Sequence, residues 1–261
     1  MKTVQDYLNG GACDIAPLLS LVLGKSNTQL YAQNDYALGD KQQQQLENFI
    51  QQREQGVPFA YLSGKKGFYH LDFKVTKDTL IPRPETELLI DITLDLLNKN
   101  QKYQVLDLGT GSGIIAVTLA DINPRWKVSA TDFSQAAINV AKINATTNIN
   151  FTQGSWFGAV TDQAFDLIVS NPPYIEESDP YLDDLAHEPQ TALVSGKDGL
   201  DDIRIIIKNA PKHLNKNGYL LLEHGYNQQQ KIVKLLNKAF HNIKIFKDYN
   251  NNDRAILAQI K

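Results

Sequence analysis

The stretch Val105-Leu106-Asp107-Leu108-Gly109-Thr110-Gly111-Ser112-Gly113-Ile114 decides the fold of this chain. Its first residues predict a buried strand, and the apolar positions from Ile114 to Ala120 predict the helix that follows. The glycines between them allow a tight turn and a close approach of the backbone to a ligand. A strand, a glycine loop and a helix in this order indicate one unit of an α/β fold.

The charge and spacing of this loop distinguish it from a dinucleotide-binding loop. The pattern G-x-G-x-x-G would need a glycine at position 114, where the chain has isoleucine. Asp107 also precedes the first glycine, and its charge would repel a pyrophosphate. A carboxylate suits a cationic ligand better, and S-adenosylmethionine carries both an ammonium and a sulfonium group. We therefore expect the loop to bind that cofactor.

A second carboxylate, Asp132, ends the predicted strand that begins at Lys127. It follows the glycine loop by about 20 residues, where a nucleotide ribose is usually bound in such folds. We expect Asp132 to accept hydrogen bonds from both ribose hydroxyls. The alternative is that Asp132 or Ser134 caps the helix that continues through Ile138.

The sequence Ile168-Val169-Ser170-Asn171-Pro172-Pro173-Tyr174 brings a further polar group to a strand end. The two prolines fix the backbone and remove two donors, so the Asn171 side-chain oxygen and nearby carbonyls remain as acceptors. A planar NH2 group needs acceptors for its two hydrogens, and Tyr174 offers a flat face to hold it. The alternative is a strand that simply ends at a proline-rich turn.

From about residue 85 the pattern alternates between helices and strands, which predicts a parallel sheet covered on both faces. The expected strands lie near 103–108, 127–131, 148–152, 165–170 and 218–223. Two further strands, 243–246 and 255–258, flank a turn-rich segment and predict an antiparallel hairpin at the sheet edge. Because ligands of open α/β sheets bind at the carboxyl ends of strands, the three motifs should converge on one rim.

Three domains are expected along the chain. Residues 1–62 form a helical domain, in which an apolar stripe ends at Gly24 and Asp40 caps a later helix. Residues 63–80 form a linker hairpin, and residues 81–261 form the α/β domain. Pro84 stands at the expected start of the first helix of that domain.

Composition excludes several classes of protein. The net charge of −3 argues against a partner that is mainly a nucleic acid backbone. The single cysteine, Cys13, cannot form an intrachain disulfide and fits the cytoplasm. We expect no signal peptide, because residues 1–6 contain no apolar run, and no membrane helix. The five histidines show no metal-ligand spacing, so no metal is expected, and we expect a monomer.

With these motifs the chain resembles the class I S-adenosylmethionine-dependent methyltransferases. More narrowly, it is similar to the bacterial release factor glutamine methyltransferases, the HemK/PrmC family. The similarity covers nearly the whole length, and it rests on six segments: Ile81 to Glu87, Asp107 to Gly113, Gly154 to Phe157, Asn171 to Tyr174, Glu188-Pro189 and Leu222 to Gly225.

The resemblance implies a Rossmann-like seven-stranded sheet, mostly parallel with an antiparallel edge hairpin, and a small N-terminal helical domain that docks the substrate. It implies methyl transfer from S-adenosyl-L-methionine to the N5 amide of the glutamine in the Gly-Gly-Gln motif of peptide chain release factors. The implied cofactor-binding residues are Asp107, Gly109, Thr110, Gly111, Ser112, Gly113, Asp132, Trp156 and Asn171. The implied catalytic residues are Asn171, Pro172 and Tyr174, and the implied substrate-binding residues are Asn171, Pro172, Pro173 and Tyr174.

Several residues keep two interpretations. Trp156 either lies beside the adenine of the cofactor or packs in the core. Arg83 and Glu85 either shape the cofactor pocket or substrate path, or form a structural ion pair and a cap. Glu188 is either a substrate contact or a loop anchor. For Glu223 and His224, at a strand end on the same rim, a structural hydrogen bond is favoured over catalysis.

Two other functions use the same features. The Asn-Pro-Pro-Tyr motif also occurs in methyltransferases that act on the N6 amine of adenine, but the chain lacks the Lys/Arg-rich segment that a nucleic acid partner favours. A protein that only docks a release factor is the second alternative. Docking alone needs no corner that orients an amine, so the Asn171 motif argues against it.

Overall fold

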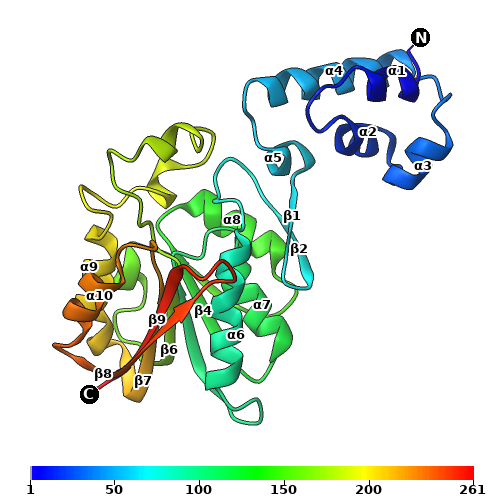
Figure 1. The fold of residues 1–261 in the computed structure, drawn as a ribbon. Coiled ribbons are helices and arrows are strands. Elements are labelled where there is room, and N and C mark those ends of the chain that lie inside the picture. The colour runs from blue at the N-terminus through cyan, green and yellow to red at the C-terminus, as the bar shows by residue number, and fades with distance from the viewer. Residues whose placement is uncertain (1) are drawn as a thin grey trace. The chain divides into compact units, whose positions relative to one another are not determined.

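The protein, described by a computed structural model over residues 2–261, divides into two units (Figure 1). The first unit ends at Gly64, and the second spans Lys65–Lys261. The hairpin that the sequence analysis assigns to a separate linker, strands β1 (Lys65–Phe68) and β2 (Leu71–Lys74), belongs to the second unit. No helix among residues 2–261 is both long enough and apolar enough to span a membrane.

The first unit is helical, as predicted. Its helices are α1 (Val4–Asn9), α2 (Ile15–Leu23), α3 (Asn27–Ala32), α4 (Asp40–Glu54) and α5 (Phe59–Ser63). Leu18 and Leu19 of α2, Leu30 of α3 and Leu46 of α4 are fully buried and form its core. Helix α2 ends at Gly24, whose φ of 63° lies in the left-handed region that glycine adopts readily.

The expected cap of α4 is wrong. Asp40 is the first residue of this helix, and the preceding residue, Gly39, takes the cap position. The Gly39 N–H donates to Gln42 Oε1 at 3.0 Å, so a side chain within the first turn satisfies this donor. An aspartate side chain at the cap is therefore not needed.

The second unit is built on a seven-stranded sheet. Its strands are β3 (Gln104–Leu108), β4 (Lys127–Asp132), β5 (Asn150–Gln153), β6 (Phe165–Ser170), β7 (Leu214–Glu223), β8 (Phe240–Lys247) and β9 (Asp253–Ile260). They are ordered β5-β4-β3-β6-β7-β9-β8, and β9 runs antiparallel to both of its neighbours. The predicted mostly parallel sheet with an antiparallel edge hairpin is confirmed. The second strand of that hairpin lies between β7 and β8.

Helices cover the sheet and bury two apolar clusters. Residues of α6 (Glu87–Leu96) and α7 (Ile114–Ile122) pack in one cluster, while α8 (Gln135–Asn144) packs against β4 and β5. The other cluster contains residues of α9 (Asp201–Asn209) and α10 (Gln229–Leu236). Short 3₁₀ segments complete the unit: Pro84–Thr86, Trp156–Ala159, Pro180–Asp183, Gln190–Ala192 and Ala210–Lys212.

The register of the central strands aligns the predicted site residues. Leu108, the last residue of β3, pairs with Thr131 of β4 on one side and with Ser170 of β6 on the other. All three strands run parallel, so the residues that follow these partners lie at the same level, at the carboxyl ends of the strands. Gly109, Asp132 and Asn171 are those residues, and the predicted convergence on one rim follows from the register.

Two neighbouring isoleucines of α9 provide a test of the packing. Ile206 is fully buried, whereas Ile205 is 42% exposed. We expect Ile206→Ala to lower the free energy of unfolding by about 2–5 kcal/mol, because it removes buried methyl groups and leaves a cavity. Urea unfolding followed by tryptophan fluorescence reports on this unit, since Trp126 and Trp156 both lie in it.

The matched control is Ile205→Ala, which changes the same side chain one position away. We expect it to change the free energy of unfolding by less than about 1 kcal/mol, as is usual for surface positions. Equal losses in the two variants would contradict the assignment of the buried face of α9.

Candidate active site

The glycine loop after β3 has a backbone that few other residues could adopt. Gly109, Gly111 and Gly113 have φ angles of 72°, 56° and 89°, in the left-handed region. A Cβ atom added at Gly113 would lie 3.1 Å from both Ala141 and Val117, so α7 and α8 pack closely at this point. The N–H groups of Gly109 and Thr110 both donate to the Thr131 carbonyl at 2.9 Å, which joins the loop to β4.

Asp107 lies behind this loop. Its side chain is fully buried, and Oδ2 accepts hydrogen bonds from the Thr110 hydroxyl at 2.6 Å and from the Ala116 N–H at 3.1 Å. Burial raises the pKa of Asp107 to about 7, although these two hydrogen bonds lower it. The carboxyl thus braces the inner side of the loop and the first turn of α7.

A first cavity of about 420 Å³ opens beside the loop. Of the residues that the sequence analysis assigns to the cofactor, Gly109, Gly111, Asp132, Trp156 and Asn171 line this cavity. Asp107, Thr110, Ser112 and Gly113 do not line it; they are buried and support the loop from within. The Asp107 side chain is fully buried and its Oδ1 has no hydrogen-bond partner among residues 2–261, so its expected contact with a cationic ligand stays a prediction.

Asp132 lines the first cavity and ties it to the glycine loop. Its Oδ2 accepts from the Gly111 N–H and its Oδ1 from the Ser134 N–H, both at 2.8 Å. Burial raises the pKa of its carboxyl, against these two hydrogen bonds. The cap of α8 is Ser134, whose hydroxyl accepts from Ala137 N–H. The alternative in which Asp132 itself caps this helix is therefore wrong.

Trp156 forms one wall of the same cavity. Its indole N–H donates to Asp202 Oδ1 at 3.2 Å, and its φ of 47° is rare for a residue with a side chain. A Cβ at Gly109 would lie 3.4 Å from the ring edge, at van der Waals contact, and the positive φ of Gly109 disfavours a residue with a side chain there. Asp202 is itself fixed by Ser195, whose hydroxyl donates to its Oδ2 at 2.7 Å. Asp202, a residue of α9, therefore fixes the plane of the Trp156 indole ring.

These residues fit a nucleoside-type ligand. The volume lies within the usual range of small-molecule sites, roughly 300–1,000 Å³. Each Asp132 oxygen accepts one backbone N–H and has further acceptor capacity, which suits a pair of sugar hydroxyls. A flat indole suits a planar base, and a glycine backbone admits a close approach. A bound S-adenosylmethionine would be compatible with each of these groups.

Asn171 stands between this cavity and a second one. The second cavity, of about 310 Å³, is lined by Asn171, Pro172 and Tyr174, while Pro173 lines the first. The Asn171 Nδ2 group donates to Thr86 Oγ1 at 3.0 Å. The structure gives the Asn171 Oδ1 atom no hydrogen bond to any residue within 2–261. This oxygen is therefore available as an acceptor.

The second cavity carries charged groups of both signs. Arg83, Arg254, Glu176 and Asp179 line it, together with the exposed side chains of Tyr181 and Tyr226. Arg83 forms an ion pair with Glu188, whose other oxygen accepts from the Ile81 N–H at 2.9 Å. Glu188 is therefore a loop anchor. Both interpretations of Arg83 apply, since this residue forms an ion pair and also lines a cavity. Its partner in the ion pair is Glu188 rather than Glu85.

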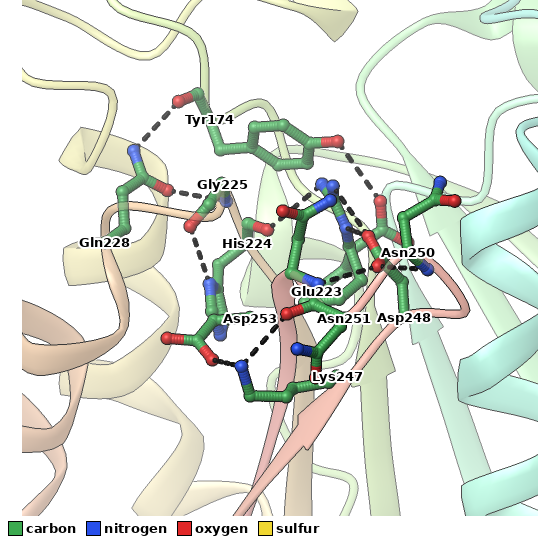
Figure 2. A network of polar contacts seen from close by, with 12 residues as sticks. Tyr174, Glu223, His224, Gly225, Gln228, Lys247, Asp248, Asn250, Asn251 and Asp253 are labelled. Carbon is green, nitrogen blue, oxygen red and sulfur yellow. Dashed lines mark hydrogen bonds and ion pairs between the residues drawn. The ribbon is translucent and has the colours of Figure 1, made fainter.

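A polar network stands behind Tyr174, as Figure 2 shows. The Tyr174 hydroxyl donates to Glu223 Oε1 at 3.2 Å, and Gln228 Nε2 donates to the Tyr174 carbonyl at 2.9 Å. His224 Nδ1 donates to the Gly225 carbonyl at 2.8 Å, and burial lowers the pKa of this histidine, so it is neutral. Glu223 and His224 thus make the hydrogen bonds that the sequence analysis favours.

Sequence reasoning missed Thr86, Asp202, Gln228 and Arg254. Thr86 lies within the segment Ile81 to Glu87, so only its partner was unknown. Asp202 and Gln228 act on Trp156 and Tyr174, which lie 46 and 54 positions away in the chain. No local pattern reports such pairs. Within residues 2–261 no group of three or more His, Cys, Asp or Glu side chains could hold a metal.

Comparison with known proteins agrees with this geometry. The family model of the methyltransferase small domain matches residues 86–200, and that of the PrmC N-terminal domain matches residues 9–64. The release factor glutamine methyltransferase of Coxiella burnetii is 46% identical over 227 residues, which cover 85% of this chain and 82% of that protein. The chain belongs to the release factor glutamine methyltransferase family.

Two further relatives extend this comparison. The family member from Shewanella oneidensis is 41% identical over 254 residues, covering 94% of this chain and 88% of its own. A methyltransferase of Pyrococcus furiosus, with a solved structure, superposes with a TM-score of 0.56 at 22% identity, over 75% of this chain and 91% of that one. At that identity the likeness supports the fold alone.

The raised pKa of Asp107 predicts how the stability of the protein depends on pH. Its pKa is about 7 in the folded protein and near 3.8 in an unfolded chain, so folding takes up a proton. The stability that this group contributes is present below about pH 4 and is lost as the pH rises through about 7. Asp107→Asn is neutral at every pH and keeps an acceptor for Thr110 and Ala116. The stability of this variant should therefore fall less between about pH 5 and about pH 8 than that of the wild type.

The measurement is urea unfolding by tryptophan fluorescence at both pH values. The comparison between variant and wild type isolates Asp107, because Glu223 and the other titrating groups are common to both proteins. Parallel pH profiles would show that Asp107 does not change its protonation state on folding.

Proposed function

We propose that this protein transfers a methyl group from S-adenosyl-L-methionine to the N5 amide of the glutamine in the Gly-Gly-Gln motif of peptide chain release factors. Family membership supports the reaction class, and one structural observation carries the chemistry. Asn171 donates its NH2 group to Thr86 and presents its oxygen at the boundary of two cavities. An acceptor at that boundary suits an amide NH2 that meets a methyl donor.

The first cavity is the proposed cofactor site. Asp132 would accept hydrogen bonds from the ribose hydroxyls, and Trp156 would lie against the adenine. Gly109 and Gly111 would contact the methionine part, while Asp107, Thr110, Ser112 and Gly113 keep the loop in shape. When bound, the cofactor supplies a methyl group on a sulfonium, which is already a strong electrophile.

The residues of this chain then have to align and activate a weak nucleophile. An amide nitrogen shares its lone pair with the carbonyl, so two acceptors on its hydrogens help to turn that pair toward the methyl group. Asn171 Oδ1 and the Pro172 carbonyl are the proposed acceptors. Their hydrogen bonds strengthen as the nitrogen becomes cationic, which stabilises the transition state. The Tyr174 ring and Pro173 would hold the amide plane.

The remaining steps need no general base from this motif. The substrate nitrogen would form a bond to the methyl carbon as the bond between that carbon and sulfur breaks, and we propose that the nitrogen proton then leaves to solvent. Holding the two reactants in line can contribute an effective concentration on the order of 10⁵ M or more. Asn171 and its neighbours thus act mainly by orientation.

The substrate is proposed to be a protein rather than a nucleic acid. Arg83 and Arg254 of the second cavity are each paired with a carboxylate, Glu188 and Asp248. Glu176 and Asp179 add further negative charge there, which would repel a phosphate backbone. The helical unit would dock the release factor. We further propose that the protein acts as a monomer in the cytoplasm, since the translation machinery that uses release factors is there.

A direct test combines the purified protein, S-adenosylmethionine and a purified release factor. We expect the Gly-Gly-Gln peptide to gain one methyl group by mass spectrometry. Asn171→Ala should reduce the rate by about 10²–10³-fold, as removal of one transition-state hydrogen bond does elsewhere. A methylated DNA or RNA in a parallel reaction, with an unmodified release factor, would refute the proposed substrate.

Asp132 provides a separate test of cofactor binding. Loss of hydrogen bonds to a charged group costs about 1.5–3 kcal/mol, so Asp132→Ala should raise the dissociation constant of S-adenosylmethionine by about 10–100-fold. Isothermal titration calorimetry measures this constant without any substrate protein. Asp162→Ala, at an exposed position outside both cavities, is the control. An unchanged constant in Asp132→Ala would contradict the ribose assignment.

A further inference from the structure

Trp156 stands on the wall of the first cavity in a backbone conformation that needs support. Its φ of 47° lies in the left-handed region, where residues with a side chain are strained. Such residues persist only where their surroundings hold them, and they gather at binding and catalytic sites. The turn that carries Trp156 is also compact, because a Cβ at Gly154 would lie only 2.7 Å from the Ala159 side chain.

The indole ring has one polar anchor. Trp156 packs against the apolar cluster to which α9 and α10 contribute, and its N–H donates to Asp202 Oδ1 at 3.2 Å. Apolar contact has no preferred direction, whereas a hydrogen bond requires the N–H to point at its acceptor. The contact with Asp202 therefore decides which way the ring lies on the cavity wall.

Asp202 is in turn held by Ser195. The Ser195 hydroxyl donates to Asp202 Oδ2 at 2.7 Å and accepts from the Asp202 N–H at 2.8 Å. Ser195 is 1% exposed, and its own N–H donates to the Ile175 carbonyl at 2.9 Å. Ile175 directly follows the Asn-Pro-Pro-Tyr corner. The anchor of the indole is therefore tied to the backbone that carries Tyr174.

An ion pair does not account for Asp202. The neighbouring Asp198 and Asp201 both pair with Arg204, but the structure gives Asp202 no cationic partner among residues 2–261. Its side chain lines the first cavity beside Trp156. Each of its oxygens is instead fixed by a neutral donor, the indole N–H or the Ser195 hydroxyl. This arrangement suits a residue that holds another side chain in place.

We propose that Asp202 is a positioning residue for the cofactor, which holds the Trp156 indole in the direction that lets the adenine of S-adenosylmethionine stack on it. This inference rests on the proposed function, because it takes Trp156 as the residue that lies against the adenine. A ring that is already held loses little freedom when the base binds, which favours affinity. Without Asp202 the indole could turn, and binding would have to order it as well.

Asp202→Ala tests the inference by isothermal titration calorimetry with S-adenosylmethionine. We expect the dissociation constant to rise by about 5–50-fold, which is part of the affinity that a base–aromatic stack contributes. Asp202→Asn keeps an oxygen that can accept the indole N–H. This conservative variant should bring the dissociation constant back to within about threefold of the wild-type value.

Asp201→Ala is the matched control, because it removes the same group from the same turn of α9. Asp201 lies outside both cavities, and its carboxylate pairs with Arg204 at 2.9 Å on the surface. Both variants take a negative charge from the start of the helix, so effects of that charge are common to them. We expect Asp201→Ala to bind S-adenosylmethionine as the wild type does.

Trp156→Phe separates the hydrogen bond from the aromatic face. Phenylalanine keeps a flat ring but has no N–H, so Asp202 has nothing to hold. Because the two residues act through one hydrogen bond, Asp202→Ala should weaken binding much less in the Trp156→Phe background than in the wild type. A role of Asp202 in folding alone would give equal losses in both backgrounds.

NMR of the indole N–H groups gives a readout without cofactor. The chain has two tryptophans, and Trp126 Nε1 is buried with no hydrogen-bond partner among residues 2–261. In Asp202→Ala the Trp156 signal should shift and its hydrogen should exchange faster with water. The Trp126 signal should stay unchanged and serves as the internal control.

The outcomes separate this inference from the proposed function. If Trp156→Ala weakens binding while Asp202→Ala leaves the dissociation constant within about twofold, the adenine assignment stands and the positioning role is overturned. An equal loss in Asp201→Ala, or an unchanged Trp156 indole signal in Asp202→Ala, would overturn it as well. If the wild type binds S-adenosylmethionine but leaves the release factor unmodified, the proposed reaction fails, and the dissociation constants still decide the inference.

Discussion

The hydrogen bond from Asn171 to Thr86 determines what the second unit can do chemically. It fixes which end of the Asn171 amide faces the cavities, and an acceptor at that point selects a substrate with NH2 hydrogens to offer. The two prolines that follow keep the backbone rigid without adding donors that would compete. The proposed methyl transfer between the first cavity and the second cavity requires that this direction is kept.

The sheet brings the partners of that interaction together. Leu108 pairs with both Thr131 and Ser170, so the glycine loop, Asp132 and Asn171 lie at one level on the rim of the sheet. Side chains from later elements then fix them: Asp202 of α9 holds Trp156, and Glu223 at the end of β7 holds Tyr174. The site contains buried groups whose polar capacity is incompletely used, such as Asp107 Oδ1 and Glu223 Oε2. Such groups are costly in a core, and others, such as Trp126 Nε1 and Thr118 Oγ1, belong to residues that line neither cavity.

Much of this arrangement could be predicted from local pattern. The parallel strands were located within a few residues, with β7 longer than expected, because buried strands are continuous apolar runs. Asp132 and Asn171 were located because each follows such a run directly. The full burial of the Asp107 side chain was not predicted, since the same sequence allows its carboxyl to face either side of the loop. The insertion of β9 between β7 and β8, and the pairing of Thr86, Asp202 and Gln228 with distant residues, depend on tertiary contacts that no local spacing encodes.

A crystal structure with S-adenosylhomocysteine and a peptide containing Gly-Gly-Gln would test the central claim most directly. The account predicts that the glutamine amide nitrogen lies within about 3.2 Å of Asn171 Oδ1, with the Asn171 NH2 group still on Thr86. The sulfur of the product cofactor should lie beyond that nitrogen, in the first cavity. A glutamine whose carbonyl oxygen faces Asn171, or whose amide lies away from the Asn-Pro-Pro-Tyr corner, would contradict the account.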